Sequence, residues 1–235
     1  MCGRYTLMTP ASELEARFDA TFEDPPEPRY NCAPGQSLPV VVGDDPDRFR
    51  EFKWGLIPSW ADDASVGNDL INARAETVAE KPSFAAAFKR RRCLVPADGF
   101  YEWVDGGGGT KQPYRVAFGD DRPFAMAGLW DRWEPTHTQT GLGDFGAGGG
   151  SHESDVVESF TVVTTEPNDV VADLHHRMAV VLDPDEESTW LHGSTEAAAR
   201  LLDPYPSEEW RTYPVSTRVN SPANDAPDLI EPVEG

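Results

Sequence analysis

Short apolar runs recur along the whole chain, and they predict a protein built mainly from β-strands. The runs are rich in β-branched and aromatic residues, and Gly, Pro or Asp residues lie at many of their ends, a pattern typical of strands. They cover residues 38–42, 93–95, 114–118, 124–127, 160–165 and 178–182.

Fewer segments show the spacing of a helix. Ser12 and Glu15 have the form of a capping box, and Leu14 and Phe18 lie one turn apart, so we expect a short amphipathic helix there. Three more helices are predicted from start signals and apolar spacing. They are residues 82–92, a segment opened by Asp183-Pro184 with Glu186 at the capping-box position, and residues 195–202.

The strands are spread through the chain, with few alternations of strand and helix and no break in composition. This distribution predicts an α+β fold, a single domain built round an antiparallel, partly barrel-like β-sheet with a few peripheral helices. The domain is expected to cover residues 2–235 after removal of Met1. Residues 136–155, rich in Gly, Ser, Thr and Asp, are expected to form a flexible surface insertion, and residues 106–109 a hairpin tip.

The charge balance is strongly acidic. The chain has 41 Asp and Glu residues against 20 Lys and Arg, a net charge of -21, and only four of its basic residues are lysines. Taken alone, this argues against a nucleic-acid ligand, because phosphate binding favours a basic surface. A carboxylate-rich, lysine-poor surface also fits a protein in concentrated salt, since the Debye length at about 1 M salt is roughly 3 Å. We favour such a halophilic origin, and the positions of the arginines then matter more than the net charge.

Several classes of protein are disfavoured by the sequence. No run approaches the roughly 18 apolar residues of a membrane span, and the N-terminus lacks a signal peptide, so we expect a cytoplasmic protein without a membrane partner. Cys2, Cys32 and Cys93 have no Cys-x-x-Cys spacing, and the five His residues show no ligand spacing, so no disulfide, metal or other cofactor is expected. Cys32 and Cys93 are predicted to be buried packing residues.

Cys2 is the first candidate for chemistry. Removal of Met1 would leave a free α-amine and a thiol on adjacent carbons of Cys2. With reference pKa values near 7.7 to 8.0 and 8.5, both groups are reactive around neutral pH. An aldehyde condenses with the amine to an imine, and the thiol then closes a five-membered thiazolidine ring. Without further signals, a small residue after the start codon would be the simpler interpretation.

Three other segments contain polar groups with catalytic potential, each with a plain structural alternative. Asn72, Arg74 and Glu76 alternate, so an extended chain directs them to one face, which is also typical of a solvated strand. Glu102 lies among aromatic residues, where burial would raise its pKa and suit it to proton transfer, unless it is a rim residue. His175 and His176 precede an apolar run, and the plain alternative there is one structural histidine and one exposed histidine.

At this point the chain resembles the SRAP family (SOS response-associated peptidase domain), which includes abasic-site-processing proteins. The resemblance runs from residue 2 nearly to the C-terminus, with the motifs in one order. The matching stretches are CGRYTL, YNCAPGQSLPVV, KWGLIPSWA, INARAETVAEKPSFAAAFKRRRCLVPADGFYEW, KQPYRV, PFAMAGLWDRW, FTVVTTEPN, HHRMAVVL and VSTRVNSPANDAPDLIEP.

The resemblance implies a mechanism that fits the aminothiol. Mature Cys2 would attack the ring-opened aldehyde of an abasic site in single-stranded DNA and form a stable thiazolidine. Asn72 would position Cys2 and the sugar, and Glu102 would act as the acid and base in imine formation and ring opening. His175, the first residue of the family's His-x-Arg-Met spacing, would shuttle protons and help to reverse the crosslink.

The resemblance also implies six DNA-binding residues. Three arginines would bind flanking phosphates, and three apolar residues would stack or wedge at a kinked strand. They are Arg4, Arg74, Arg177, Trp54, Pro58 and Trp103. Ala179 departs from the family, which usually has Pro after Arg-Met, and we expect this change to be tolerated because Pro there adds rigidity and no chemistry.

Two other functions remain open at the level of the sequence. A thiol peptidase could use Cys2 and His175, and cleavage of the chain's own Met1-Cys2 bond already belongs to the family mechanism. A noncatalytic module would only bind single-stranded DNA. We favour a monomeric enzyme whose partner is single-stranded DNA containing abasic sites.

Overall fold

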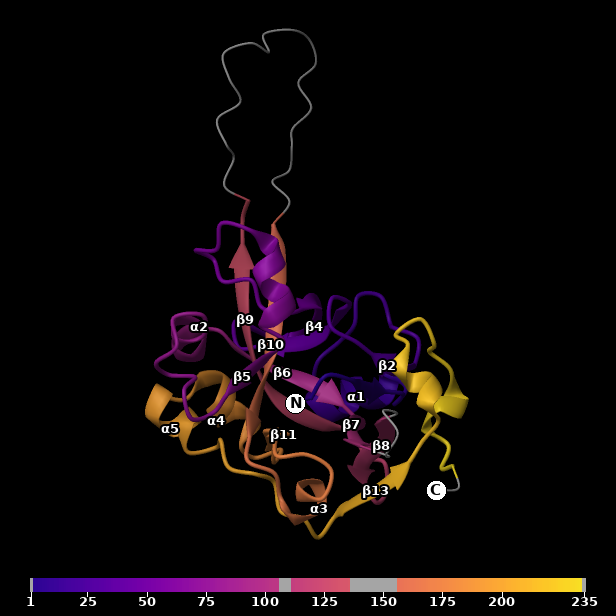
Figure 1. The fold of residues 1–235 in the computed structure, drawn as a ribbon. Coiled ribbons are helices and arrows are strands. Elements are labelled where there is room, and N and C mark those ends of the chain that lie inside the picture. The colour runs from indigo at the N-terminus through magenta and orange to yellow at the C-terminus, as the bar shows by residue number, and fades with distance from the viewer. Residues whose placement is uncertain (1, 106–110, 136–155, 234–235) are drawn as a thin grey trace, which may run out of the picture.

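The computed structural model describes residues 2–105, 111–135 and 156–233 (Figure 1). The predicted hairpin tip at residues 106–109 and the predicted insertion at residues 136–155 lie outside these ranges. The described chain contains two β-sheets and a few short helices, so the predicted α+β fold is confirmed.

The first sheet has five strands in the order β13-β8-β7-β1-β2, and every neighbouring pair is antiparallel. The short first strand lies between β7 and β2, with Tyr5 opposite Phe100 on one side and Cys32 on the other. The N-terminal strand is therefore paired on both sides and lies inside the sheet, next to its edge strand β2. The strands are β1 (Tyr5–Leu7), β2 (Arg29–Cys32), β7 (Gly99–Asp105), β8 (Lys111–Phe118) and β13 (Trp210–Pro214).

The second sheet has eight strands, and five of them form a closed ring in the order β10-β4-β3-β6-β9-β10. The predicted partly barrel-like sheet is therefore confirmed. It is not wholly antiparallel, because β10 runs parallel to both β4 and β5. The strands are β3 (Ser37–Val42), β4 (Asp45–Trp54), β5 (Asn72–Arg74), β6 (Arg92–Ala97), β9 (Phe124–Trp133), β10 (Val157–Thr165), β11 (Met178–Ala179) and β12 (Val181–Leu182).

The helices are short and lie outside the barrel (Figure 1). Figure 1 shows α2, α4 and α5 on one side, and the C-terminal segment on the other side, beside β2. The α-helices are α1 (Ala11–Phe18), α2 (Ala85–Arg90), α3 (Asp169–Ala172), α4 (Glu187–His192) and α5 (Thr195–Ala199), and the 3₁₀ helices are η1 (Ala64–Asp69), η2 (Thr217–Asn220) and η3 (Pro227–Ile230).

The caps differ in part from the predicted ones. Helix α1 begins after Pro10 without a side-chain cap, and the Glu15 carboxylate accepts a hydrogen bond from the backbone of Phe22, so the predicted capping box was wrong. Pro10 already fixes the backbone dihedral that helix entry needs. Before α4, the Glu186 carboxylate accepts from the backbone of Asp183 at 3.1 Å, which is half of the predicted reciprocal pair.

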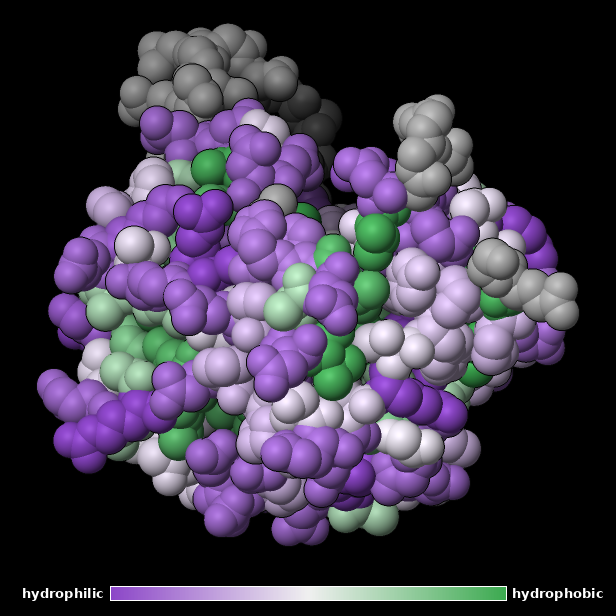
Figure 2. All heavy atoms as spheres, turned by 60° about the horizontal axis from the view of Figure 1, so that its bottom comes forward, coloured by the Kyte–Doolittle hydropathy of each residue, from purple (hydrophilic) through white to green (hydrophobic). Residues whose placement is uncertain are grey.

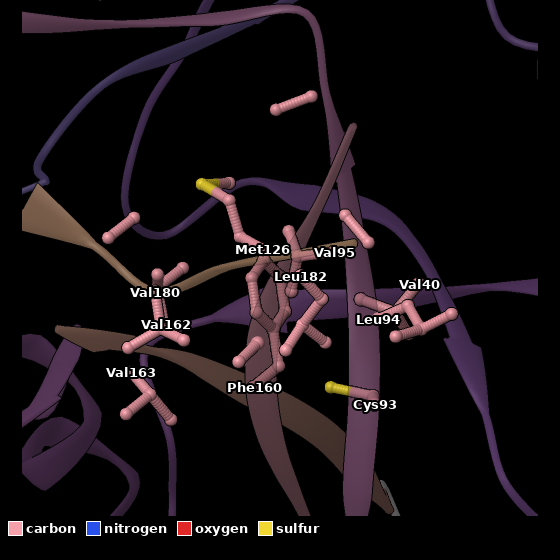
Figure 3. Close-up of a cluster of buried hydrophobic side chains, with 14 of the residues drawn as sticks. Val40, Cys93, Leu94, Val95, Met126, Phe160, Val162, Val163, Val180 and Leu182 are labelled. Carbon is pink, nitrogen blue, oxygen red and sulfur yellow. The ribbon is translucent and has the colours of Figure 1, made fainter. Parts of the chain in front are cut away.

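The core fills the barrel with β-branched and aromatic side chains (Figure 3). Cys93 and Cys32 are buried free thiols, as predicted. Cys93 lies on β6 opposite Gly128 of β9, where a Cβ atom would come within 2.7 Å of the Cys93 sulfur. The two strands therefore require glycine at this position.

The surface is mainly polar. Figure 2 shows one face on which hydrophilic side chains predominate, with small apolar areas between them. In the part of the chain that is described, the exposed large hydrophobic residues are Trp60, at 59%, and Val233, at 37%.

A buried carboxylate anchors the N-terminal segment to the five-stranded sheet. Asp98 is fully buried and accepts hydrogen bonds from the Thr6 hydroxyl at 2.6 Å and from the backbone of Met8 and Thr9 at 2.5 and 2.8 Å. The guanidinium of Arg115, also fully buried, lies 3.7 Å from the Asp98 carboxylate. These contacts fix the direction in which the chain leaves Cys2.

We expect Asp98→Ala to lower the free energy of unfolding by about 3 to 5 kcal/mol, because it removes a buried acceptor and part of the compensation of the Arg115 charge. Asp120 provides the control, since its carboxylate is 60% exposed. Asp120→Ala should change the free energy by less than about 1 kcal/mol. Urea unfolding measures both, and equal losses would contradict the structural role of Asp98.

Candidate active site at the N-terminus

Cys2 lies where the two sheets meet. It directly precedes the segment that leads into β1, and its side chain is fully buried. Asn72, the first residue of β5 in the other sheet, donates a hydrogen bond from Nδ2 to the carbonyl oxygen of Cys2 at 2.9 Å. The pairing of β5 with β10 places Asn72 opposite Val162 and so fixes its position.

Asn72 has a second group directed into a buried space. Its Oδ1 atom is buried and has no hydrogen-bond partner among the described residues. A buried carbonyl oxygen without a donor costs free energy, so such an atom is typically satisfied by water or a ligand. Asn72 can therefore hold the Cys2 backbone with one atom and accept from an amine or hydroxyl with the other.

Glu102 supplies a carboxyl group with an altered proton affinity. It lies on β7, next in the sheet to β1, and only 2% of its side chain is exposed. Burial raises its pKa from 4.5 to about 7. Both protonation states are then populated near neutral pH, which suits a group that must donate and later accept a proton.

His175 faces this carboxyl group. Its Nδ1 lies 4.0 Å from the Glu102 carboxylate and accepts a hydrogen bond from the backbone of Arg177 at 3.1 Å. Burial lowers the pKa of His175 from its ordinary value, so the imidazole is neutral at pH 7. The neighbouring His176 is exposed, and the centroids of the two imidazole rings are 4.2 Å apart.

The thiol itself is protonated in this environment. Burial raises the pKa of the Cys2 thiol to about 12, and the nearby Glu102 charge adds to the effect. A thiol of this kind reacts slowly without a base, because the thiolate is the nucleophile. The four residues predicted for chemistry, Cys2, Asn72, Glu102 and His175, thus lie around one buried point that has a possible base.

The three predicted phosphate-binding arginines lie in different environments. Arg4 is half-buried and donates to the Asn31 side chain at 2.9 Å and to the carbonyl oxygen of Val219 at 2.7 Å. Arg74, at the end of β5, is exposed and has no ion pair within the described ranges. Arg177 is 9% exposed and forms a two-point ion pair with Glu76. Arg74 is thus the most accessible of the three.

The predicted stacking residues differ more from expectation. Trp54 is 1% exposed, and its ring packs between those of Tyr5 and Phe160. The distances between ring centroids are 5.2 Å to Tyr5 and 6.1 Å to Phe160. Pro58 is also buried. Neither presents a face to a base in this structure, so we correct their assignment to that of packing residues. The sequence alone does not distinguish an aromatic ring that is buried in the core from one that is exposed to a ligand, which explains why Trp54 was assigned to stacking.

Trp103 keeps an accessible position. It is half-buried, and its Nε1 donates to the Asn220 side chain at 2.7 Å, near the surface. The exposed Trp60 was not singled out from sequence, although the polar residues around it, Ser59 and Asp62, were a usable signal.

A surface pocket borders the site beyond β5. It has a volume of about 470 Å³, and its lining combines two arginines with polar and acidic residues. The lining residues are Arg74, Glu76, Thr77, Glu166, His176 and Arg177. Glu166 and His176 were not predicted as part of a binding site, whereas Glu76 was predicted to share one face with Asn72 and Arg74 and lies in a turn after β5.

Two further properties bear on possible ligands. Within residues 2–105, 111–135 and 156–233, no group of three or more His, Cys, Asp or Glu side chains could hold a metal ion. None of the helices in these ranges is long and apolar enough to cross a membrane.

Comparison with known proteins gives a consistent result. The family model for SOS response associated peptidase (SRAP) matches residues 1–222. The abasic site processing protein YoqW of Bacillus subtilis (strain 168) is 37% identical over 98% of this chain and 99% of its own. The abasic site processing protein HMCES of Gallus gallus is 33% identical over 88% of this chain and 67% of its own.

Solved structures share the fold. A crystal structure of a protein from Bacteroides thetaiotaomicron superimposes with a TM-score of 0.84 at 26% identity, over 99% of this chain and all of the other. A protein from Bordetella bronchiseptica gives a TM-score of 0.73 at 22% identity, over 92% of this chain, which shows the fold alone.

Glu102→Gln is expected to change the pH dependence of stability. Because the folded pKa is about 7 and the ordinary one 4.5, the folded protein keeps a proton that the unfolded chain releases, so stability falls as pH rises from 4.5 to 7. At pH 8 this costs about 3 kcal/mol, and Gln, which does not titrate, avoids the cost.

The measurement is urea unfolding at fixed ionic strength. The variant should be more stable than the wild type at pH 8 and similar to it near pH 4. A stability difference between the two proteins that does not grow between pH 4.5 and 7 would show that Glu102 is not buried as a neutral acid.

Proposed function

This chain belongs to the SOS response associated peptidase (SRAP) family, and from that premise we propose that it processes abasic sites in single-stranded DNA by forming a thiazolidine crosslink through mature Cys2. The observation that carries the proposal is the placement of Cys2 beside Asn72, with the raised pKa of Glu102 and the neutral His175 close by. The names of the relatives, abasic site processing proteins, support the substrate class.

The first step is the removal of Met1. Hydrolysis of the Met1-Cys2 peptide bond consumes one water and leaves the α-amine of Cys2 free. We assign this step to the protein itself, as an autopeptidase activity of Cys2. The new ammonium group then lies on the same residue as the thiol, and a positive charge at that distance favours the thiolate.

The crosslink forms in two further steps. The amine adds to the C1′ aldehyde of the ring-opened sugar, and Glu102 in its acid form gives a proton to the departing hydroxyl, so one water leaves and an imine forms. The Cys2 thiol then adds to the imine carbon, its proton moves to the nitrogen, and the five-membered ring closes. Net, the protein and the DNA join with the loss of one water.

Glu102 and His175 have separate tasks in this scheme. A carboxyl group with a pKa of about 7 can serve as acid for imine formation and as base for opening the sugar ring. The neutral imidazole of His175, 4.0 Å from that carboxyl group, can take the thiol proton and return it when the crosslink reverses. Asn72 Oδ1 is the proposed acceptor for the amine or a sugar hydroxyl.

The strand is proposed to cross the surface next to this point. Arg74 and Arg177 would bind flanking phosphates beyond β5, and Arg4 would do so on the side of the C-terminal segment. Trp103 is the proposed stacking residue, with its ring oriented by Asn220. We further propose that the protein acts as a monomer in the cytoplasm of a salt-adapted cell, in line with its net charge of -21.

A general thiol peptidase is less consistent with the site. Repeated cleavage of other peptides needs a thiolate in every turnover, whereas burial raises the pKa of the Cys2 thiol to about 12. The single cleavage of the Met1-Cys2 bond is intramolecular, so it can proceed with a slow nucleophile. A noncatalytic binding module leaves unexplained why a carboxyl group with a pKa near 7 is buried beside the N-terminus.

Cys2→Ala is expected to abolish a covalent DNA adduct. Mature protein is incubated with a uracil-containing oligonucleotide treated with uracil glycosylase, and the mixture is run on a denaturing gel. Wild type should give a shifted band whose intact mass equals protein plus DNA less one water. Cys32→Ala is the matched control, because Cys32 is also a buried thiol of raised pKa.

Two outcomes would refute the proposal. One is a shifted band that persists in Cys2→Ala. The other is a native protein in which Met1 is still attached and which nevertheless forms the adduct, since the ring requires the free amine.

Salt should separate reversible binding from crosslinking. With three phosphate contacts, affinity for an intact strand should fall roughly 100-fold between 0.1 and 1 M salt. The final crosslink yield at saturating protein should change little, because a covalent bond is not screened. Anisotropy and gel densitometry measure the two quantities, and parallel losses would contradict the covalent scheme.

A further inference from the structure

We propose that Glu76 is a specificity-determining residue, whose carboxylate occupies the position on Arg177 that a strand phosphate takes and must be displaced before DNA binds. The inference rests on the proposed function, and it predicts that the Glu76 carboxylate weakens the binding of an intact strand. The proposed ligand of the pocket beyond β5 is a phosphodiester of the DNA strand. The Glu76 carboxylate competes with that phosphodiester for Arg177.

The ion pair has the geometry of an anion site that is already filled. The two terminal nitrogens of Arg177 each donate to a different oxygen of Glu76, with Nη2 and Oε2 3.0 Å apart. Two parallel N–H groups bind a carboxylate or a phosphate in the same way. A phosphate can therefore replace the Glu76 carboxylate without rearrangement of the arginine.

The arginine is the fixed partner. Only 11% of the Arg177 side chain is exposed, and its Nη2 also donates to the carbonyl oxygen of Thr164 on β10 at 2.5 Å. Its Nε is buried without a hydrogen-bond partner in the described part of the chain. The hydrogen bond to Thr164 and the burial of the side chain hold the guanidinium in place when the carboxylate leaves.

The glutamate is the mobile partner by position and exposure. Glu76 follows the end of β5 in a turn, and 49% of its side chain is exposed, compared with 11% for Arg177. Among the side chains of the described residues, Arg177 is the donor to the Glu76 carboxylate. That hydrogen bonding lowers the pKa of Glu76, so it remains charged and competes with DNA at neutral pH.

The surroundings suit a phosphate. The pocket of about 470 Å³ contains Arg74, which is exposed and has no ion pair in the described ranges, and His176. Glu166 lines the same pocket and is also exposed, and no ion pair or hydrogen bond of its side chain occurs in the described ranges. Glu166 therefore matches Glu76 in charge and location but not in contact with Arg177.

This difference gives the experiment. Anisotropy of a labelled, undamaged single strand is measured with wild type, Glu76→Gln and Glu166→Gln at one salt concentration. Glu76→Gln should bind roughly five- to tenfold more tightly, because the phosphate no longer displaces a charged competitor. Glu166→Gln should bind less than about twofold more tightly, since it changes only the general charge of the pocket.

A second readout tests specificity. Crosslinking to an abasic oligonucleotide is repeated with excess undamaged strand as competitor. The competitor should slow Glu76→Gln more than wild type by the same five- to tenfold factor. A purely structural brace would not produce this difference.

The outcomes distinguish the two proposals. An equal gain in DNA affinity in both variants would show that only the net charge of the pocket matters. Weaker DNA binding by Glu76→Gln would show that Glu76 is a structural support for Arg177. Either result overturns the inference. If wild type crosslinks abasic DNA through Cys2 while Glu76→Gln behaves like Glu166→Gln, only the role of Glu76 fails. If no crosslink forms with wild type, the proposed function fails whatever the binding data show.

Discussion

The hydrogen bond from Asn72 to the carbonyl oxygen of Cys2 joins the two sheets at the point where the chain begins. It depends on β1 lying inside the five-stranded sheet and on β5 lying alongside β10, so the site exists only when both sheets are complete. The Asp98 contacts with Thr6, Met8 and Thr9 hold the same segment from the other direction. Burial of this junction is also what raises the pKa values of Cys2 and Glu102. Fold and proposed chemistry thus share one cause.

The strands with strong apolar patterns were predictable from the sequence, and the strands that depend on pairing with neighbouring strands were not. Residues 38–42 and 160–165 correspond to β3 and most of β10, because continuous β-branched runs favour strands in any context. Strand β4 was missed, since it begins with Asp45-Pro46 and buries only three of its ten residues, Phe49, Phe52 and Trp54. Its pairing with β3 and β10 compensates for weak local propensity. The parallel direction of β10 beside β4 and β5 likewise has no local signal.

The candidate site divides in the same way. Cys2 and Glu102 were recognisable from local features, a second-position cysteine and a carboxyl group between aromatic residues, and the structure places both in buried positions. Contacts across long sequence separations were not recognisable. Arg177 meets Glu76 101 residues away, and Arg4 meets Val219 215 residues away. The burial of Trp54 follows from its packing between Tyr5 and Phe160, which no spacing in the sequence indicates.

An acidic protein that is proposed to act on DNA has to obtain selectivity from something other than net attraction. Burial raises the pKa of the Cys2 thiol, so the thiol alone is a poor nucleophile, and the ring closes only after the amine has formed the imine. On the binding side, the Arg177 charge is already compensated by Glu76, and of the two arginines that line the pocket beyond β5, Arg74 is the exposed one. Weak reversible contact then limits how long an intact strand stays, whereas an aldehyde that reaches the buried amine is retained by covalent bonds. The negative surface then adds to the selectivity for abasic sites. It weakens the binding of every strand equally, and the covalent crosslink offsets this repulsion only at a damaged nucleotide.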